Sequence, residues 1–377
     1  MPDQEIWTRI GKLQSLIQIN NVHFALIGQR VDLLYFTGTA QNGYLYVPAS
    51  GQPLLLVKKY YPRARAESPI DRLVELPSIR QLPEIIERHD RNIPRLMGLA
   101  MDVMPFSEVE FLRRLFPEQE MVDISSLIHE IRWSKTEWEI EQMRSVATKS
   151  AQCFDLAIEH CSPEANPIKL ASTIQTYARR LGHGARLRLR YHNEKAFPYE
   201  INIVPSSVSP PSVVGTDCVV QMDFNWMLNG YHIRETRLLI VGNPPEQLVN
   251  ACHGVAGIHD IIIQRAVAGK PANQVYREIK EIVKRRGYGA SLFGCDARGR
   301  PWASGPLGHG IGMELREPPF INEQDQTVLS PDMTLAILPV LSLSSRLCVS
   351  MGSVIRIGEN GNELISKVPA KIFSKSH

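Results

Sequence analysis

Apolar residues in the first third of the chain follow alternating helical and strand-like patterns. A helix near the N-terminus is predicted by the three- and four-residue spacing of Ile6, Ile10, Leu13 and Ile17. Similar spacing predicts helices over 79–89 and 105–115, and short apolar runs predict strands over 23–28, 33–36 and 96–101. Two apolar runs within 44–57 enclose a Pro-Ala-Ser-Gly turn and predict a hairpin. We therefore expect residues 1–133 to form a mixed α/β domain.

A second pattern begins at Ser134. The stretch Ser134-Lys-Thr-Glu137 has the form of a capping box, which predicts a helix start. Further helices are predicted over 168–181, 246–268 and 272–286, and strands over 187–204, 218–241, 312–315, 334–340 and 350–357. Helices that alternate with blocks of antiparallel strands predict an α+β domain over 134–377.

Composition restricts the class of protein. A chain of 377 residues with 44% hydrophobic and 21% charged residues fits two globular domains. The net charge of +3 argues against a nucleic-acid or membrane-surface partner. We find no membrane-spanning run and no secretory signal, so we expect a cytoplasmic protein. The six cysteines form no Cys-x-x-Cys pair, which fits reduced thiols better than a structural zinc site.

Four motifs follow one another over most of the chain. They are SKTEWEIEQMR from Ser134, NGYHIRETR from Asn229, GHGIGMELREPP from Gly308 and IGENGNELI from Ile357. With these motifs the chain resembles the creatinase/Xaa-Pro peptidase family, which includes prolidase and aminopeptidase P. The resemblance implies an α/β N-terminal domain, an α+β "pita-bread" C-terminal domain and a homodimer. It also implies a small-molecule or short-peptide substrate.

The resemblance allows the metal-binding positions to be compared one by one. In metal-dependent members, two aspartates, a histidine and two glutamates hold two divalent ions that activate water. Asp223 matches the first aspartate and His309 matches the histidine, but Arg234 replaces the second aspartate. Leu338 and Gly352 replace the two glutamates. Because an arginine cannot ligate a metal and repels a dication, we expect neither a metal nor another cofactor.

A second departure concerns the acid/base residue. The resemblance implies a histidine in a Pro-His segment before the strand of Asp223, and metal-free creatinase uses that histidine. The corresponding loop, residues 204–217, contains no histidine. Arg316 stands where peptidases have a second catalytic histidine and where creatinase also has an arginine. The mechanism of creatinase therefore does not transfer intact.

Titratable side chains in these motifs are the candidates for catalysis. They are His309, Asp223, Glu317 and His232, which are able to move protons or orient a charged partner. His232 shares strand parity with Arg234, whereas Glu235 points to the opposite face. The alternatives are a hydrogen-bonded core role for His309 and solvated positions for His232 and Glu317.

Arginines supply the candidate substrate-binding groups. Convergence of Arg234, Arg237 and Arg316 would form a receptor for a carboxylate or phosphate. The alternative is that each arginine pairs with a local acid such as Glu235, Glu314 or Glu317. A different metal set, built from Asp223, His232, Glu235, His309 and Glu317, is disfavoured by the opposite parity of Glu235. The run Arg186, Arg188 and Arg190 predicts an exposed or dimer-facing strand instead of a site.

Three functional hypotheses follow. The first is a metal-independent hydrolase that cleaves a C–N bond of a small polar or anionic substrate with its Arg/His/Asp site. The second is a non-catalytic pseudopeptidase that keeps the cavity for binding. The third is an Xaa-Pro dipeptidase or aminopeptidase with a remodelled metal site. The sequence favours the first hypothesis, because the Gly-His-Gly segment persists beside an altered metal shell.

Overall fold

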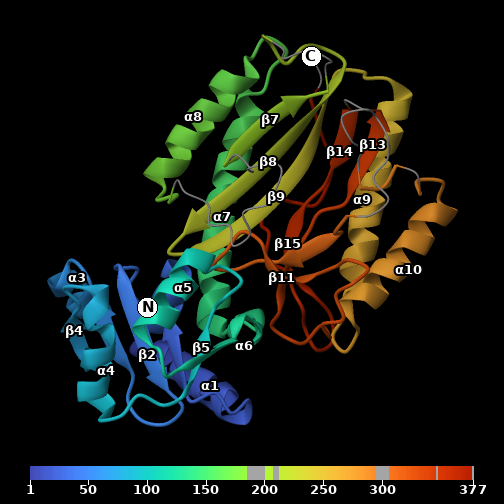
Figure 1. Ribbon diagram of the computed structural model, residues 1–377. Helices are drawn as coiled ribbons and strands as arrows, with labels where there is room; N and C mark the ends of the chain where they lie inside the picture. The colour runs from blue at the N-terminus through green and yellow to red at the C-terminus, as the bar shows by residue number, and fades with distance from the viewer. Residues whose placement is uncertain (185–199, 207–211, 290, 294–304, 345–346, 376–377) are drawn as a thin grey trace. The chain divides into compact units, whose positions relative to one another are not determined.

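The computed structural model describes residues 1–184, 200–206, 212–289, 291–293, 305–344 and 347–375. The chain divides into two compact units, Met1–Arg132 and Trp133–His377, each with its own fold (Figure 1). The strand run Arg186, Arg188 and Arg190 lies outside the described residues. None of the described helices is both long and apolar enough to cross a bilayer.

Unit 1 is built on a six-stranded mixed sheet with the order β4-β3-β2-β1-β5-β6. The strands are β1 (Phe24–Ile27), β2 (Gly43–Pro48), β3 (Leu54–Val57), β4 (Leu73–Glu75), β5 (Leu96–Leu99) and β6 (Glu120–Asp123). Antiparallel pairing of β1, β2 and β3 confirms the predicted hairpin, and β5 pairs in parallel with β1 and β6. Every residue of β1, β2 and β3 is buried.

Helices supply the apolar side chains that cover this sheet. They are α1 (Asp3–Ile19), α2 (Arg30–Thr37), α3 (Tyr61–Glu67), the 3-10 helix η1 (Ile79–Gln81), α4 (Leu82–Asp90), α5 (Phe106–Leu115) and α6 (Ser125–Trp133). The predicted face of α1 is confirmed, because Ile6, Ile10, Leu13 and Ile17 are all buried. One core cluster joins the sheet to α4 and α5 through Leu82, Ile86, Leu112 and Phe116.

The prediction of a strand over 33–36 is wrong. These residues belong to α2, which begins where the side chain of Gln29 accepts hydrogen bonds from the backbone N–H groups of Val31 and Asp32. It ends at Gly38, which adopts the left-handed conformation at φ 79°. The helix is buried on most sides, so its continuous apolar run resembles that of a buried strand.

Unit 2 contains two principal sheets. The first has the order β17-β9-β8-β7 and consists of β7 (Ile201–Pro205), β8 (Cys218–Leu228), β9 (Tyr231–Val241) and β17 (Phe373–Lys375). The second has the order β11-β10-β12-β15-β16 and consists of β10 (Gly308–Gly310), β11 (Glu317–Phe320), β12 (Thr334–Ile337), β15 (Ser353–Arg356) and β16 (Glu363–Leu364). A separate hairpin pairs β13 (Val340–Ser344) with β14 (Leu347–Ser350).

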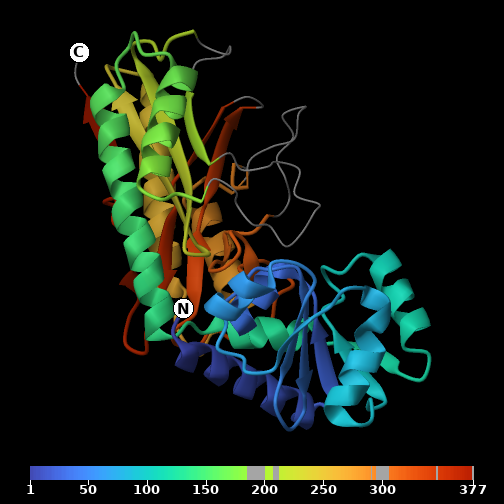
Figure 2. The same cartoon turned by 90° about the vertical axis from the view of Figure 1, so that its left-hand side faces the viewer.

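Helices cover the outer face of each sheet. Figure 1 and Figure 2 show α7 (Glu137–His160) and α8 (Pro167–Arg180) along the β7–β8–β9 sheet, and α9 (Glu246–Arg265) and α10 (Ala272–Arg285) on the side of β12–β14. A large apolar cluster includes Val255, Ile258, Tyr276 and Ile279 of α9 and α10 together with Leu335 and Ile337 of β12. The α+β class predicted for this domain is therefore confirmed.

Several predicted boundaries in unit 2 need correction. The capping box lies at Thr136 and Glu139 instead of Ser134 and Glu137, because the Thr136 hydroxyl accepts from the Glu139 N–H and the Glu139 carboxylate accepts from the Thr136 N–H. The strand predicted over 312–315 is a bend between β10 and β11. Most of the strand predicted over 187–204 lies outside the described residues, and β7 begins only at Ile201.

A backbone bridge joins the two sheets of unit 2. Thr236 of β9 and Gly352, which precedes β15, exchange two hydrogen bonds with N···O distances of 3.1 and 2.9 Å. A second link runs from the His232 N–H to the Gly312 carbonyl at 2.8 Å. These links bring β9 against the glycine-rich segments that the motifs contain.

The capping box of α7 yields a stability prediction. Thr136→Ala removes the hydroxyl that caps the helix, so we expect the free energy of unfolding to fall by about 1 kcal/mol in urea denaturation. Thr136→Ser keeps a capping hydroxyl and is the matched control, expected to retain most of the stability. Equal losses in both variants would show that the methyl group of Thr136, and not the cap, carries the effect.

Candidate functional site

The candidate site is built on one face of the β8–β9 hairpin. The register pairs Asp223 with Thr236 and Asn225 with Arg234, so these four side chains share the face that is turned toward Gly352. The Thr236 hydroxyl donates to Asp223 Oδ1 at 2.7 Å, and the Asn225 amide donates to Asp223 Oδ2 at 3.3 Å. Both carboxylate oxygens of Asp223 are therefore already hydrogen-bonded within the protein.

Arg234 lies beside this carboxylate as an ion pair. Its Nε is 3.9 Å from Asp223 Oδ1, which is too long for a hydrogen bond. The side chain is 21% exposed, so the pair faces a space that solvent reaches. The predicted counter-charge for Asp223 is present, and a permanent cation lies where the resemblance places a second aspartate.

Leu338 and Gly352 are in direct contact. A Cβ atom added to Gly352 would lie 2.6 Å from Leu338 Cδ1 and 3.0 Å from Thr236 Oγ1. The leucine side chain thus fills the space beside Gly352 that a larger residue would need. The two positions that the resemblance assigns to glutamates therefore hold a hydrocarbon contact with no oxygen ligand.

His309 lies in β10, between two glycines that permit close backbone packing. A side chain at Gly310 would overlap the backbone carbonyl of Pro318 in β11. The imidazole Nδ1 is 2.9 Å from the Gly310 carbonyl oxygen, and Nε2 has no hydrogen-bond partner among the described residues. Burial, followed by the positive charges of Arg234 and Arg316, lowers the pKa of His309 to about 3, so the ring is neutral near pH 7.

Glu317 and Arg316 complete the surroundings of His309. Glu317 is buried and accepts from the Lys135 ammonium group at 2.9 Å, in a salt bridge whose side chains are 4% and 2% exposed. A side chain at Gly312 would crowd both members of this pair. The Arg316 guanidinium lies over the Phe320 ring, 5.2 Å from its centre. The charges of Arg316 and Glu317 both act on the imidazole of His309.

His232 is a buried residue and not a solvated one. Its backbone N–H donates to the Gly312 carbonyl at 2.8 Å, and its Nδ1 lies 3.1 Å from the same oxygen. The solvated alternative for His232 is therefore wrong. The ring lies on the same face of β9 as Arg234, next to Gly312, which is in contact with the Lys135–Glu317 pair.

Arg237 does not converge with the other two arginines. It shares parity with Glu235, on the face of β9 opposite Arg234, and is fully buried. Its guanidinium donates to the backbone carbonyls of Thr236, Gly352, Val368 and Pro369. The expectation of a three-arginine receptor is wrong for this residue, which instead holds the strand junction in place.

Glu235 is the buried acid beside Arg237. It accepts from the Ser150 hydroxyl of α7 and from the backbone N–H groups of Lys367 and Val368. Burial raises the pKa of Glu235, and the charge of Arg237 opposes that rise. Its position away from Asp223 confirms the parity argument against an alternative metal set.

The side chains present do not fit a dinuclear metal centre. Among the residues that the structure describes, no three His, Cys, Asp or Glu side chains gather closely enough to hold a metal ion. Asp223 is engaged by Thr236 and Asn225 and lies beside a guanidinium. A dication next to Arg234 would meet like-charge repulsion with little carboxylate charge to offset it.

Three residues of the site went unnoticed in the sequence. Thr236 shares the parity of Arg234, so strand periodicity alone was sufficient to place it on the site face. Asn225 lies two residues after Asp223 in β8, so strand periodicity also places its side chain on the site face. Lys135 carries no such signal, because it lies 182 positions from Glu317 and only the fold brings the two together.

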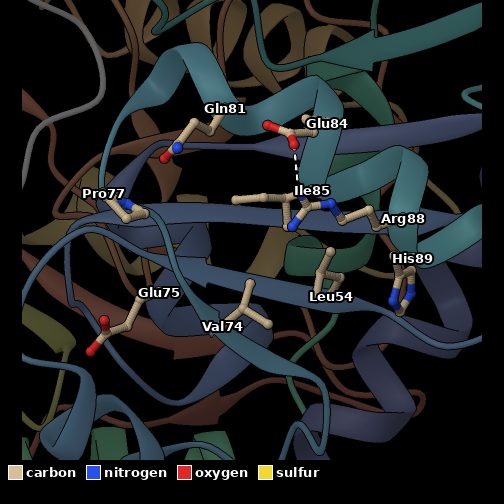
Figure 3. A pocket seen from close by; sticks show the side chains of 9 residues that line it. All are labelled: Leu54, Val74, Glu75, Pro77, Gln81, Glu84, Ile85, Arg88 and His89. Carbon is tan, nitrogen blue, oxygen red and sulfur yellow. Dashed lines mark hydrogen bonds and ion pairs between the residues drawn. The ribbon is translucent and has the colours of Figure 1, made fainter.

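Unit 1 has a pocket of its own, shown in Figure 3. It has a volume of about 510 Å³ and is lined by Leu54 of β3 and Val74 of β4, by Ile85 of α4, and by the exposed Glu84–Arg88 ion pair of the same helix. An exposed pair of this kind contributes little to binding or stability. The pocket contains none of the candidate site residues.

The contact between Leu338 and Gly352 predicts coupling between the two positions. Gly352→Ala should cost about 1–3 kcal/mol in unfolding free energy through overpacking, and Leu338→Ala should cost a similar amount through lost packing. In the double variant the smaller side chain at position 338 makes room for the new methyl group at position 352. The loss of unfolding free energy in the double variant should therefore be smaller than the sum of the two single losses by at least about 0.5 kcal/mol. Strict additivity in denaturant titrations would contradict the contact.

The depressed pKa of His309 predicts a pH effect on stability. Because the unfolded histidine binds protons more readily, stability should fall as pH drops from 6.5 toward the folded pKa of about 3. Between pH 6.5 and 5 the loss attributable to His309 should be on the order of 1–2 kcal/mol.

His309→Gln cannot titrate and should lack this part of the pH dependence. His253→Gln, at an exposed position of α9, is the matched control and should behave like the unsubstituted protein. Identical pH profiles for all three proteins in urea denaturation would contradict the burial of a neutral His309.

Known proteins resemble the chain over nearly its full length. An Xaa-Pro dipeptidase from Pyrococcus furiosus is 24% identical over 372 residues, covering 97% of this chain and 99% of the relative. The prolidase structure from Pyrococcus horikoshii superposes with a TM-score of 0.82 at 20% identity, covering 97% of this chain and 100% of the other. An Xaa-Pro dipeptidase structure from Bacillus anthracis gives a TM-score of 0.83 at 19% identity, covering 98% and 100%.

Family models match both units. Residues 9–133 match the creatinase/prolidase N-terminal domain, and residues 141–360 match metallopeptidase family M24. The expected fold is thereby confirmed as an α/β domain followed by a pita-bread domain. The chain belongs to metallopeptidase family M24, the family of hydrolases that includes the Xaa-Pro peptidases.

Proposed function

We propose that the C-terminal unit is a hydrolase site that works without a dinuclear metal centre. Its substrate is a small carboxylate with a C–N bond to be cleaved, such as a short peptide or another N-acyl amino acid. The proposal is supported mainly by the side chains at positions 234, 338 and 352, which lack the carboxylates that the resemblance implies there. A guanidinium stands beside Asp223, and Leu338 packs against Gly352.

The arginines bind and polarise the substrate in this proposal. Arg234 is partly exposed, and the charges of both Arg234 and Arg316 act on the imidazole of His309, so both guanidinium groups lie in its surroundings. Such groups form bidentate hydrogen bonds with a carboxylate and stabilise negative charge that develops on a carbonyl oxygen. Asp223 keeps Arg234 in place as its counter-ion.

His309 transfers the proton in this mechanism. Water attacks the carbonyl carbon of the C–N bond, His309 Nε2 accepts a proton from that water, and the proton then passes to the leaving nitrogen. Burial first, and the charges of Arg234 and Arg316 second, lower the pKa of this ring to about 3, so it is a weak base; a bound carboxylate offsets the second cause and raises the pKa only in part. Glu317, held by Lys135, supports the cation that forms, and His232 lines the same face.

The proposal is tested by hydrolysis assays on chelator-treated protein. A panel of Xaa-Pro dipeptides, other dipeptides and N-acyl amino acids should reveal turnover that neither chelator nor added Mn²⁺ changes. His309→Gln should reduce that turnover about 100-fold or more, while His253→Gln should leave it intact. Turnover that chelators abolish would overturn the proposal in favour of a remodelled metal site. Ligand binding without turnover would overturn it in favour of a non-catalytic binder.

Rebuilding the family's ligand set tests the same account from the opposite direction. The triple variant Arg234→Asp, Leu338→Glu, Gly352→Glu places carboxylates at all three altered positions. Mn²⁺ should raise the melting temperature of this variant, because a ligand that binds the folded state stabilises it. The variant Arg234→Asp alone is the control and should respond weakly.

The melting temperature of the unsubstituted protein provides the decisive comparison. It should not change with Mn²⁺, Co²⁺ or Zn²⁺ under the same conditions. An equal rise in the unsubstituted protein and in the triple variant would contradict the proposed loss of the metal centre. If the triple variant proves unstable, the unsubstituted protein alone tests the proposal, because a rise of its melting temperature with any of these ions would contradict it.

A further inference from the structure

The pocket of unit 1 lies between helix α4 and β4, the outermost strand of the sheet, and we call it the α4–β4 groove. Val74 of β4 and Ile85 of α4 point toward one another, with Leu54 of β3 beside them (Figure 3). All three side chains are apolar, and the volume of about 510 Å³ is typical of a small-ligand site. The groove therefore has room for an apolar side chain of a ligand.

The outer edge of β4 leaves the backbone of one residue open. The Leu76 N–H donates to the Val57 carbonyl of β3 at 2.8 Å, so by the alternation of a parallel ladder Leu73 and Glu75 direct their backbone groups away from β3. The Tyr61 hydroxyl donates to the Leu73 carbonyl at 3.2 Å and covers that part of the edge. Within the described part of the chain, the backbone N–H and C=O of Glu75 have no hydrogen-bond partner.

This edge limits the length of a ligand. One open residue allows one antiparallel pair, in which a ligand residue exchanges two hydrogen bonds with the backbone of Glu75. Tyr61 blocks further pairing on one side, and Pro77 has no N–H to donate on the other. A single residue pair buries far less surface than the roughly 1,000 Å² of a stable protein interface. The groove therefore fits a free short peptide better than a folded partner.

Strand alternation decides which ligand side chain enters the groove. The side chain of Glu75, and that of the ligand residue paired with it, lie on the face opposite Val74. In an antiparallel ligand the residue that follows the paired one lies opposite Val74. Its side chain then points into the space between Val74 and Ile85. An apolar residue at this position matches the groove.

A cation lies where such a ligand ends. The C-terminal part of α4 is at the beginning of β4, because the His89 ring lies 3.0 Å from the Arg72 guanidinium. Arg88 lines the groove from this part of the helix and pairs with Glu84, in side chains that are 73% and 58% exposed. Because an exposed pair is weak, Arg88 can exchange Glu84 for the carboxylate of a ligand at little cost.

We propose that the α4–β4 groove binds the C-terminal end of a free short peptide whose last residue is apolar. The penultimate residue pairs with the backbone of Glu75, and the last side chain packs between Val74 and Ile85. The terminal carboxylate replaces Glu84 beside Arg88. This binding site belongs to unit 1, and the inference does not depend on the hydrolase proposed for unit 2.

The methyl NMR signal of Ile85 in the full chain tests this inference. The signal is identified by its absence in Ile85→Val, and acetyl-alanyl-leucine should shift it in a saturable manner. Acetyl-alanyl-serine should bind at least about tenfold more weakly, because it buries no apolar side chain. Methylation of the alanine nitrogen should weaken binding about two- to tenfold, because the Glu75 carbonyl loses its donor. Spectra of the peptide in the same samples show whether it stays intact.

Two variants of α4 test the carboxylate contact in opposite directions. Arg88→Met should weaken the binding of acetyl-alanyl-leucine about two- to fivefold, as expected for an exposed ion pair. Glu84→Gln removes the competing carboxylate and should bind the peptide at least as tightly as the unsubstituted protein. Thermal melts establish that both variants are folded.

Four results would overturn the inference. They are an unshifted Ile85 signal, equal affinities for the leucine and serine peptides, no effect of N-methylation, and equal weakening by Glu84→Gln and Arg88→Met. Peptide binding that shifts only isoleucine signals of unit 2 would count as the first of these. Loss of the hydrolase proposal in the chelator assay would leave all the expected shifts of Ile85 unchanged, so the two failures are distinguishable.

Discussion

The arrangement of the site depends on the backbone bridge between Thr236 and Gly352. This bridge joins the two sheets of the C-terminal unit where a side chain at position 352 would collide with Leu338 and Thr236. Arg237 fixes the junction from the opposite face, because its buried guanidinium binds the Gly352 carbonyl and two carbonyls of the following loop. Breaking a buried charged network of this kind is strongly destabilising.

The altered residues are consistent with one another physically. Gly352 leaves a space beside its backbone, and the side chain of Leu338 fills that space with hydrocarbon. Arg234 supplies a positive charge beside the Asp223 carboxylate. The described side chains at these positions therefore match one another in volume and charge.

Sequence patterns predicted the two-domain fold well, because long periodic segments and glycine stops mark most helices. They failed for 33–36, where a buried helix has the same apolar run as a buried strand, and for 312–315, where a bend separates two short strands. At the site, strand parity placed Arg234 and His232 on one face correctly. The same rule places Arg237 on the opposite face, so its assignment to the site was inconsistent with its position in β9.

Contacts between residues that are far apart in the sequence could not be predicted from the sequence. No local pattern connects Lys135 with Glu317, or Leu338 with the space beside Gly352. The hydrogen-bond contact of His309 Nδ1 with the Gly310 carbonyl oxygen is likewise not predicted by any sequence pattern. The motifs therefore predict which fold carries the site, but they do not predict the contacts within it.

The central claim is that this member of family M24 has exchanged its metal ligands for an arginine and a hydrocarbon contact. Elemental analysis of the purified full chain, after incubation with Mn²⁺, Co²⁺ or Zn²⁺ and removal of unbound ions, tests that claim most directly. The account predicts far less than one ion per chain for every metal. One or two tightly held ions per chain would contradict it and would mean that Asp223 and His309 still serve as metal ligands.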